Sequence, residues 1–193
     1  MAFYINLDRR ADRREQIEKE FADRGLNVER FKGIEHAYPA VGCTLSHIAV
    51  LKLARERGYE SAMIFEDDFT FLVSKDEWTD LLAKLPSVYD VVMICCGVIK
   101  PGTYYNETFD RVQEVQQTAG YIVHSRFYNR IIANFEEGAR KFIESPHIHW
   151  LYALDQYWKS LQTESEWFSF KKKIAKQRAG FSDITQSFVE YDF

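Results

Sequence analysis

Proline, flexible linkers and long apolar runs are all scarce in this sequence of 193 residues. It has four prolines and no glycine- or serine-rich stretch, so nothing marks a domain boundary and residues 1–193 are expected to form a single domain. No apolar run approaches the ~20 residues that cross a bilayer. The first residues carry no basic segment followed by a long apolar one, which argues against a signal peptide. We therefore expect no integral membrane segment.

Cysteine is also rare, with only Cys43, Cys95 and Cys96 present. The last two are adjacent in an apolar run that predicts a buried strand. Neighbouring side chains of a strand point to opposite faces, so these two are not expected to bond to each other. An odd number of cysteines without a spaced framework indicates free thiols in a reducing compartment. We expect a cytoplasmic protein.

An excess of positive charge is absent as well. The chain has 25 lysines and arginines against 29 acidic residues, a net charge of -4. Nucleic acid is therefore not expected as a partner, since its binding normally needs a basic face. Hydrophobic residues make up 46% of the chain and charged residues 28%, which is typical of a globular rather than a disordered chain.

Short apolar runs alternate with segments of helical spacing. Thr44 is a candidate N-cap for a helix in which Leu45, Ile48 and Leu51 recur on one face. Alternating strands and helices predict an α/β fold, with a mixed, largely parallel central sheet flanked by helices. The predicted strands are 3–7, 28–34, 61–65, 90–96 and a pair at 112–117 and 120–123; further helices are predicted around 17–21, 78–85 and 127–135.

The acidic triplet Glu66-Asp67-Asp68 follows the apolar run 61–65 directly. In an extended segment, residues two apart point the same way, so Glu66 and Asp68 are expected to lie on one side. Two adjacent carboxylates repel each other unless a cation is present, and Mn²⁺ or Mg²⁺ would relieve that repulsion and bridge phosphates. The triplet alone is also compatible with a solvated turn or with a metal-dependent phosphohydrolase.

Several further motifs occur in a fixed order. Tyr-Ile-Asn-Leu-Asp-Arg-Arg at 4–10 resembles the opening motif of family-25 glycosyltransferases, which modify lipopolysaccharide and collagen. Gly-Cys-Thr-Leu-Ser-His at 42–47 is similar to that family's Gly-Cys-x-x-Ser-His segment, and the triplet resembles its acidic metal-binding motif. Thr-Ala-Gly-Tyr at 118–121, Leu-Asp-Gln at 154–156 and the segment 177–184 resemble later motifs. The resemblance covers about residues 3–184.

This resemblance implies a GT-A fold and a nucleotide-sugar donor, most often UDP-galactose or UDP-glucose. The acceptor would be a saccharide or a glycosylated protein. Because charge builds up on the leaving diphosphate, a metal Lewis acid suits the chemistry. We expect Glu66 and Asp68 to hold Mn²⁺ or Mg²⁺, with Asp67 contacting the donor ribose or sugar. A peripheral contact with a membrane stays open, because many sugar acceptors are lipid-linked.

Four other residues are candidates for donor binding. Asn6 follows the first strand and is placed to contact the base or ribose, although a turn or cap role is equally compatible. Arg10, chosen over Arg13 and Arg14 as nearest to the strand end, offers donors for phosphate or ribose oxygens. Ser46 and His47 are expected in the first turn of a helix, where backbone N–H groups favour an anion; a structural role for His47 is the alternative. The full set of donor-binding candidates is Asn6, Arg10, Ser46, His47 and Asp67.

Asp155 lies in an otherwise aromatic and apolar stretch, 150–158. An unpaired carboxylate is costly to bury there, which makes it our candidate general base for an inverting transfer. A helix-surface acid is the alternative. The late histidine that some GT-A enzymes use as a further metal ligand has no match near 181–183, and Asp183 is a substitute. The missing histidine also leaves open a glycosyltransferase-like module that binds nucleotide or glycan without turnover.

Overall fold

The computed structural model describes residues 1–190, apart from the side chains of Pro146 and His149. Its central element is an eight-stranded sheet in the order β2-β1-β3-β8-β5-β9-β7-β6. The strands are β1 (Ala2–Asn6), β2 (Glu29–Lys32), β3 (Ser61–Glu66), β5 (Val91–Lys100), β6 (Thr103–Tyr104), β7 (Phe109–Arg111), β8 (Glu114–His124) and β9 (Trp167–Phe170).

Two small antiparallel sheets lie beside the large one. One pairs β4 (Phe69–Phe71) with β10 (Ala175–Gln177), and the other pairs β11 (Gly180–Ser182) with β12 (Ser187–Val189). The helices are α1 (Ala11–Ala22), α2 (Pro39–Glu56), α3 (Lys75–Leu82), α4 (Tyr128–Glu144), α5 (Leu154–Tyr157) and α6 (Lys159–Gln162), with 3₁₀ turns at Ser125–Phe127 and Pro146–Leu151.

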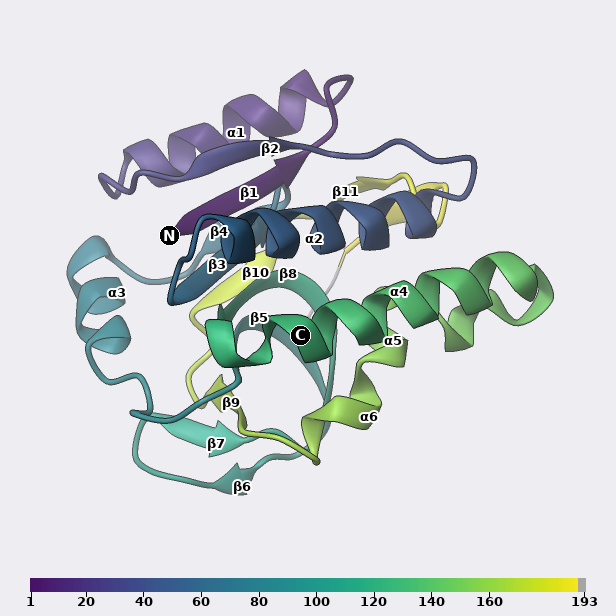
Figure 1. Cartoon of the computed structure of the whole chain (residues 1–193). Coiled ribbons are helices and arrows are strands. Elements are labelled where there is room, and N and C mark those ends of the chain that lie inside the picture. The colour runs from purple at the N-terminus through teal and green to yellow at the C-terminus, as the bar shows by residue number, and fades with distance from the viewer. Residues whose placement is uncertain (191–193) are drawn as a thin grey trace.

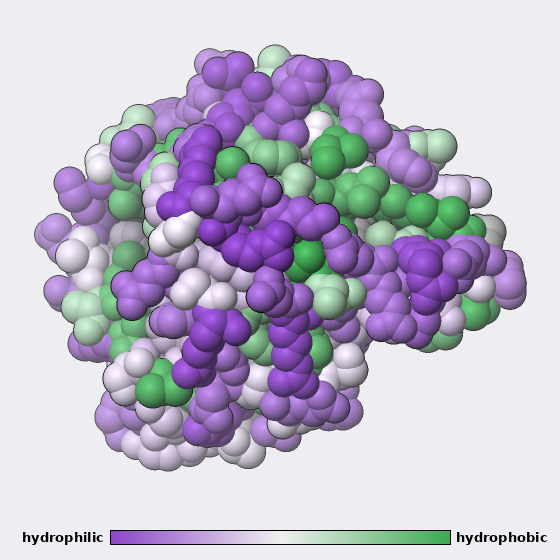
Figure 2. All heavy atoms as spheres, viewed as in Figure 1, coloured by the Kyte–Doolittle hydropathy of each residue, from purple (hydrophilic) through white to green (hydrophobic). Residues whose placement is uncertain are grey.

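The helices cover both faces of the sheet (Figure 1). In the central strands β1, β3, β5 and β8, neighbouring residues pack into different hydrophobic cores, as a period of two requires. In β3, Ile64 packs with α2, α4 and α5, whereas Phe65 packs with α1, α3, β4 and β10. Figure 2 shows a mostly hydrophilic outer surface, with hydrophobic atoms gathered over the right-hand part of α2. None of the helices within residues 1–190 has the length and apolar character to cross a membrane.

The predicted α/β fold with a mixed central sheet is confirmed. β1 runs parallel to β2 and β3, and β5 runs parallel to β9, whereas β8 is antiparallel to both β3 and β5. Parallel strands end at the same edge of a sheet. The carboxyl ends of β1 and β3 therefore lie side by side, with Ile5 opposite Glu66.

Two local predictions are wrong in an informative way. The helix expected to begin at Thr44 begins at Pro39, which occupies its first turn, and Thr44 lies inside it. A proline at this position has a fixed φ that suits a helix start and lacks only an N–H that would be unpaired anyway. The strand pair expected at 112–117 and 120–123 is one strand, β8, whose break is Gln117 in the left-handed region with φ of 71°.

Candidate functional site

A cavity of about 360 Å³ opens at the carboxyl ends of β1 and β3. In open α/β sheets, ligands usually bind beyond these strand ends. Residues far apart in the sequence line the cavity, and all eight predicted site residues are among them. They are Asn6, Arg10, Ser46, His47, Glu66, Asp67, Asp68 and Asp155.

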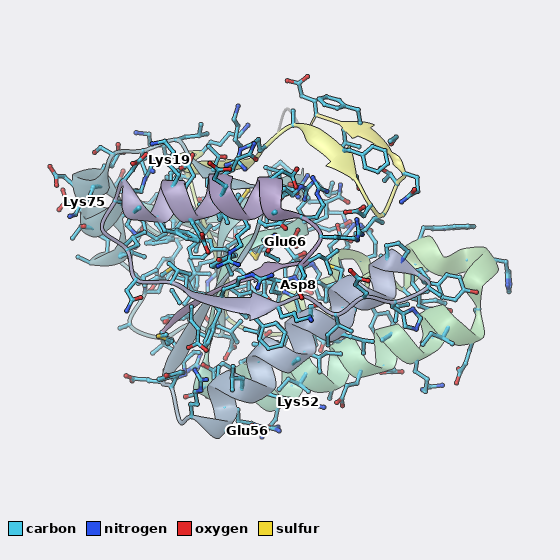
Figure 3. All side chains as sticks on the ribbon, turned by 90° about the horizontal axis from the view of Figure 1, so that it is seen from above. Asp8, Lys19, Lys52, Glu56, Glu66 and Lys75 are labelled. Atoms are coloured by element: carbon cyan, nitrogen blue, oxygen red, sulfur yellow. The ribbon has the colours of Figure 1, made fainter. Side chains whose placement is uncertain are left out.

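The acidic triplet does not run on as an extended segment, contrary to expectation. β3 ends at Glu66, and the chain turns through Asp67 and Asp68 before β4 begins at Phe69. The three carboxylates consequently have different partners, although all face the same cavity. In Figure 3, Glu66 lies within the molecule near α1, whereas Lys75 lies at its periphery.

Glu66 is held from two sides. The Thr118 hydroxyl donates a short hydrogen bond to its Oε1, and Nε2 of His47 lies 3.4 Å from the same oxygen. Burial alone would raise the pKa of Glu66, but its contacts with His47 and Thr118 outweigh burial and lower it. This carboxylate is therefore held in its charged form.

Asp67 and Asp68 share one arginine. NH1 of Arg13 lies 2.9 Å from Oδ1 of Asp67 and 3.1 Å from Oδ2 of Asp68. Burial raises the pKa of Asp67, and burial together with the Glu66 charge raises the pKa of Asp68 to about 7. One guanidinium therefore does not offset the negative charge of this corner.

Asn6 positions this carboxylate turn. It is buried, its Nδ2 donates to Oδ2 of Asp67 at 2.8 Å and to the Arg10 carbonyl at 3.0 Å, and its Oδ1 accepts from Arg30 at 3.1 Å. Every polar atom of its side chain thus has a protein partner. Its direct contact with a nucleotide stays a prediction.

Arg10 lies at the rim of the cavity. Its guanidinium pairs with Asp12 and, at 3.1 Å, with Asp183, which also pairs with Arg9 at 2.9 Å. Both arginines lower the pKa of Asp183 against the effect of its burial. Asp183 is thus neutralised by arginines, which disfavours it as the missing metal ligand. Arg14, the third arginine considered, pairs with Glu18 in solvent and does not line the cavity.

Ser46 and His47 are not in the first turn of their helix, as was expected. Because α2 begins at Pro39, they lie about two turns inside it, and the helix-terminus argument for anion binding fails. Ser46 is buried, donates to the Gly42 carbonyl at 2.7 Å and accepts from the Ile34 N–H at 2.8 Å. It fastens the preceding loop to α2.

Gly42 explains why the loop can approach so closely. A Cβ added there would lie 2.5 Å from the Ile34 carbonyl oxygen.

His47 is fully buried, and its Nδ1 lies 2.7 Å from the Tyr121 hydroxyl. These contacts give Ser46 the structural role that was considered for His47, and they place His47 beside Glu66.

Asp155 faces the cavity from the first turn of α5. Its Oδ2 accepts a hydrogen bond from the Gln117 N–H at 3.0 Å, and the positive φ of Gln117 is part of this arrangement. Burial raises the pKa of Asp155. The carboxylate is therefore more basic than an exposed aspartate, as a proton acceptor near neutral pH should be.

Gln177 is a site residue that the sequence analysis missed. β10 pairs with β4 and places Gln177 opposite Phe69, next to the acidic turn. Its Nε2 lies 3.4 Å from Oδ1 of Asp68, while its Oε1 is buried without a hydrogen-bond partner. The only available signal was its position at the start of the last motif, 177–184.

The donors around the acidic turn fit a hard divalent cation. Glu66, Asp68 and the unpartnered Oε1 of Gln177 are all oxygen donors on one cavity. Carboxylate and amide oxygens are what Mg²⁺ and Mn²⁺ prefer. The orphaned carbonyl oxygen is the observation that supports this fit, because a buried acceptor normally has a partner.

Comparison with the sequence patterns of known families finds no match. Comparison with curated proteins finds none either. Solved structures do match. A glycosyltransferase involved in the glycosylation of the major capsid of PBCV-1 has a TM-score of 0.61 at 9% identity, over 96% of this chain and 95% of that one. The A197 protein from STIV has a TM-score of 0.55 at 12% identity, over 97% and 92% of the two chains. The chain thus has a GT-A-like glycosyltransferase fold.

Proposed function

We propose that this protein is a metal-dependent glycosyltransferase that moves a hexose, galactose or glucose, from a UDP-sugar to a hydroxyl of a saccharide or glycoprotein. The observation that carries the proposal is the convergence of the acidic turn and Asp155 on one cavity at the strand ends. The GT-A-like fold and the ordered family-25 motifs support the same assignment. Lipopolysaccharide or a related glycan is the class of acceptor that those motifs suggest.

In this proposal Glu66, Asp68 and Gln177 hold Mn²⁺ or Mg²⁺. The cation, when bound, stabilises the charge that develops on the leaving diphosphate. Asp67, held by Asn6 and Arg13, contacts the ribose or the sugar. Arg10 lies at the cavity rim with guanidinium donors suited to phosphate oxygens.

Asp155 is proposed as the base. Its carboxylate takes the proton of the acceptor hydroxyl as that oxygen attacks the anomeric carbon, which inverts the configuration there. The Gln117 N–H holds the Asp155 carboxylate through Oδ2 and so orients it in the cavity. A raised pKa favours this proton transfer, because the acid and base strengths are closer to each other.

The test is release of free UDP from a panel of UDP-sugars, with and without Mn²⁺, beside the Asp68→Ala variant. Slow hydrolysis by water makes an acceptor unnecessary. Metal-dependent UDP release from one sugar, lost in the variant, is the expected result. Full activity of the variant would overturn the assignment of Asp68 to the metal.

One observation favours a second candidate, a binding module without turnover. Arg13 already pairs with both Asp67 and Asp68, so the acidic turn has a resident counter-charge. Calorimetry with UDP separates the candidates. Binding of UDP without any product on an acceptor panel favours the module. If UDP neither binds nor is released, a UDP-sugar donor is ruled out.

A further inference from the structure

A second group of metal-binding side chains meets Glu66 from the α2 side. Cys43 and His47 are four residues apart on α2, so they lie on one face of the helix. One ligand atom from each of Cys43, His47 and Glu66 lies within 4.8 Å of the other two. All three residues line the cavity. Sulfur, nitrogen and oxygen donors are thus gathered around one point that a ligand can reach.

His47 gives an independent reason to consider a ligand there. The residue is fully buried, yet its Nε2 has no hydrogen-bond partner. The nearest oxygen, Oε1 of Glu66, is 3.4 Å away, beyond a good hydrogen bond. Buried polar atoms nearly always have a hydrogen bond. A buried ring nitrogen that faces a carboxylate and a thiol with only a long contact to the carboxylate is therefore well placed to bind a cation.

Tyr121 completes the pattern that metal-binding histidines show. Its hydroxyl lies 2.7 Å from Nδ1 of His47, and the two rings stack with centroids 5.6 Å apart. Histidine ligands usually use one ring nitrogen for the metal and the other for a fixed hydrogen bond. With its proton on Nδ1, His47 donates to the Tyr121 oxygen and presents the Nε2 lone pair to the cluster.

We propose that Cys43, His47 and Glu66 bind a divalent cation that prefers sulfur and nitrogen ligands, represented by Zn²⁺. Three protein ligands with a fourth position open to a cavity are typical of reactive zinc sites. The thiol proton of Cys43 leaves to solvent as the metal–sulfur bond forms. The thiolate and the Glu66 carboxylate then balance the two positive charges, and His47 stays neutral.

The proposal has a consequence for the other cation. Glu66 belongs both to this cluster and to the oxygen donors proposed for Mn²⁺, so the two metals compete for one carboxylate. A thiolate and an imidazole favour Zn²⁺ strongly over Mn²⁺. Zn²⁺ is therefore expected to block the Mn²⁺ site. The binding site itself is independent of the proposed transferase activity.

Titration of the metal-free full chain with Co²⁺, a spectroscopic substitute for Zn²⁺, tests the proposal. A thiolate ligand gives a near-ultraviolet charge-transfer band. We expect one band-producing Co²⁺ per chain, displaced by Zn²⁺. Cys43→Ala should lose the band and at least about tenfold in affinity. Cys96→Ala is the matched control, because Cys96 is also a half-buried free thiol but lies outside the cluster.

Absence of the band in the wild-type chain, or its persistence in Cys43→Ala, would overturn the proposal. Circular dichroism checks that the variant folds. If it does not fold, alkylation of the wild-type thiols followed by mass spectrometry decides: Zn²⁺ should protect Cys43 and leave Cys96 unaffected. Equal alkylation of Cys43 with and without Zn²⁺ counts against the site. None of these measurements needs a sugar nucleotide, so they stand or fall separately from the transferase proposal.

Discussion

The Arg13 guanidinium lies 2.9 Å from Asp67 and 3.1 Å from Asp68, so one cation pairs with two adjacent carboxylates. Removing it leaves both negative charges in a largely buried corner. Arg13→Met should lower the free energy of unfolding of the metal-free protein by about 2 kcal/mol, less than for a fully buried pair. Thermal or urea unfolding measures this, and added Mn²⁺ should stabilise the variant more than the wild type.

Arg14→Met is the control for that prediction. Arg14 is the neighbouring arginine on α1, and its pair with Glu18 lies in solvent. Exposed pairs contribute at most about 1 kcal/mol, so this variant should unfold close to the wild type. Equal losses in the two variants would mean that Arg13 acts through general helix stability and not through the acidic turn.

The pH dependence of stability follows from Asp68. Its pKa is raised from 3.8 to about 7 by burial and by Glu66, so its proton is held more tightly in the folded state than in the unfolded state. The stability gained from this proton is complete below about pH 4 and is lost as the pH rises through about 7. The Asp68→Asn side chain cannot ionise, so this variant should not lose that stability as the pH rises.

With a chelator present to remove metal ions, we therefore expect Asp68→Asn to be more stable than the wild type by about 1 kcal/mol or more near pH 8. A shift of one pKa unit corresponds to about 1.4 kcal/mol. The gain should shrink towards pH 5. A gain that does not vary with pH would show that the charge on Asp68 is not its origin. The same variant should lose Mn²⁺ binding, so stability and metal affinity should change in opposite directions.

Much of the fold could be predicted from local patterns. The apolar run before Glu66 predicted β3, and the alternation of strands and helices predicted the layered α/β fold. The helix containing His47 was predicted, but its start was misplaced because Thr44 is a common capping residue. The true start removes the first-turn role expected for Ser46 and His47.

The site depended on contacts that no local pattern contains. The pairing of β10 with β4 brings Gln177 to Asp68 across 109 positions. The left-handed turn at Gln117, a residue type without a strong preference for that region, places its N–H on Asp155. Motif resemblance identified the cavity-lining segments, but only the fold shows which of their atoms have partners.

Gly42 offers a test of the loop that closes over α2. Glycine within a helix is normally about 1 kcal/mol less favourable than alanine. Here an added Cβ would meet the Ile34 carbonyl oxygen at 2.5 Å, so alanine should be less favourable than glycine at this position. We expect Gly42→Ala to lower the free energy of unfolding by about 1–3 kcal/mol, as overpacking does.

Gly138→Ala on α4 is the comparison for Gly42→Ala. Its Cβ would meet the Tyr157 ring at 3.0 Å. A side chain can move where a hydrogen-bonded backbone cannot, so chemical denaturation should find a smaller loss there. Should Gly42→Ala be as stable as the wild type, the loop would be free to shift, and the contact between Ser46 and Ile34 would not be a fixed feature.

Asp155 separates the transferase from a binding module. Asp155→Asn keeps the size of the side chain and its bond from Gln117 but cannot accept a proton from an acceptor. Loss of general-base catalysis should lower kcat by about 10²–10⁴-fold, while UDP affinity measured by calorimetry stays unchanged.

Because burial raises the pKa of Asp155, wild-type activity should fall on acidification at a higher pH than an exposed aspartate would give. Asp110→Asn, a half-buried acid on β7 outside the cavity, should leave both measurements unaltered. A variant that binds UDP weakly, or one that retains full kcat, would each remove Asp155 from the role of base.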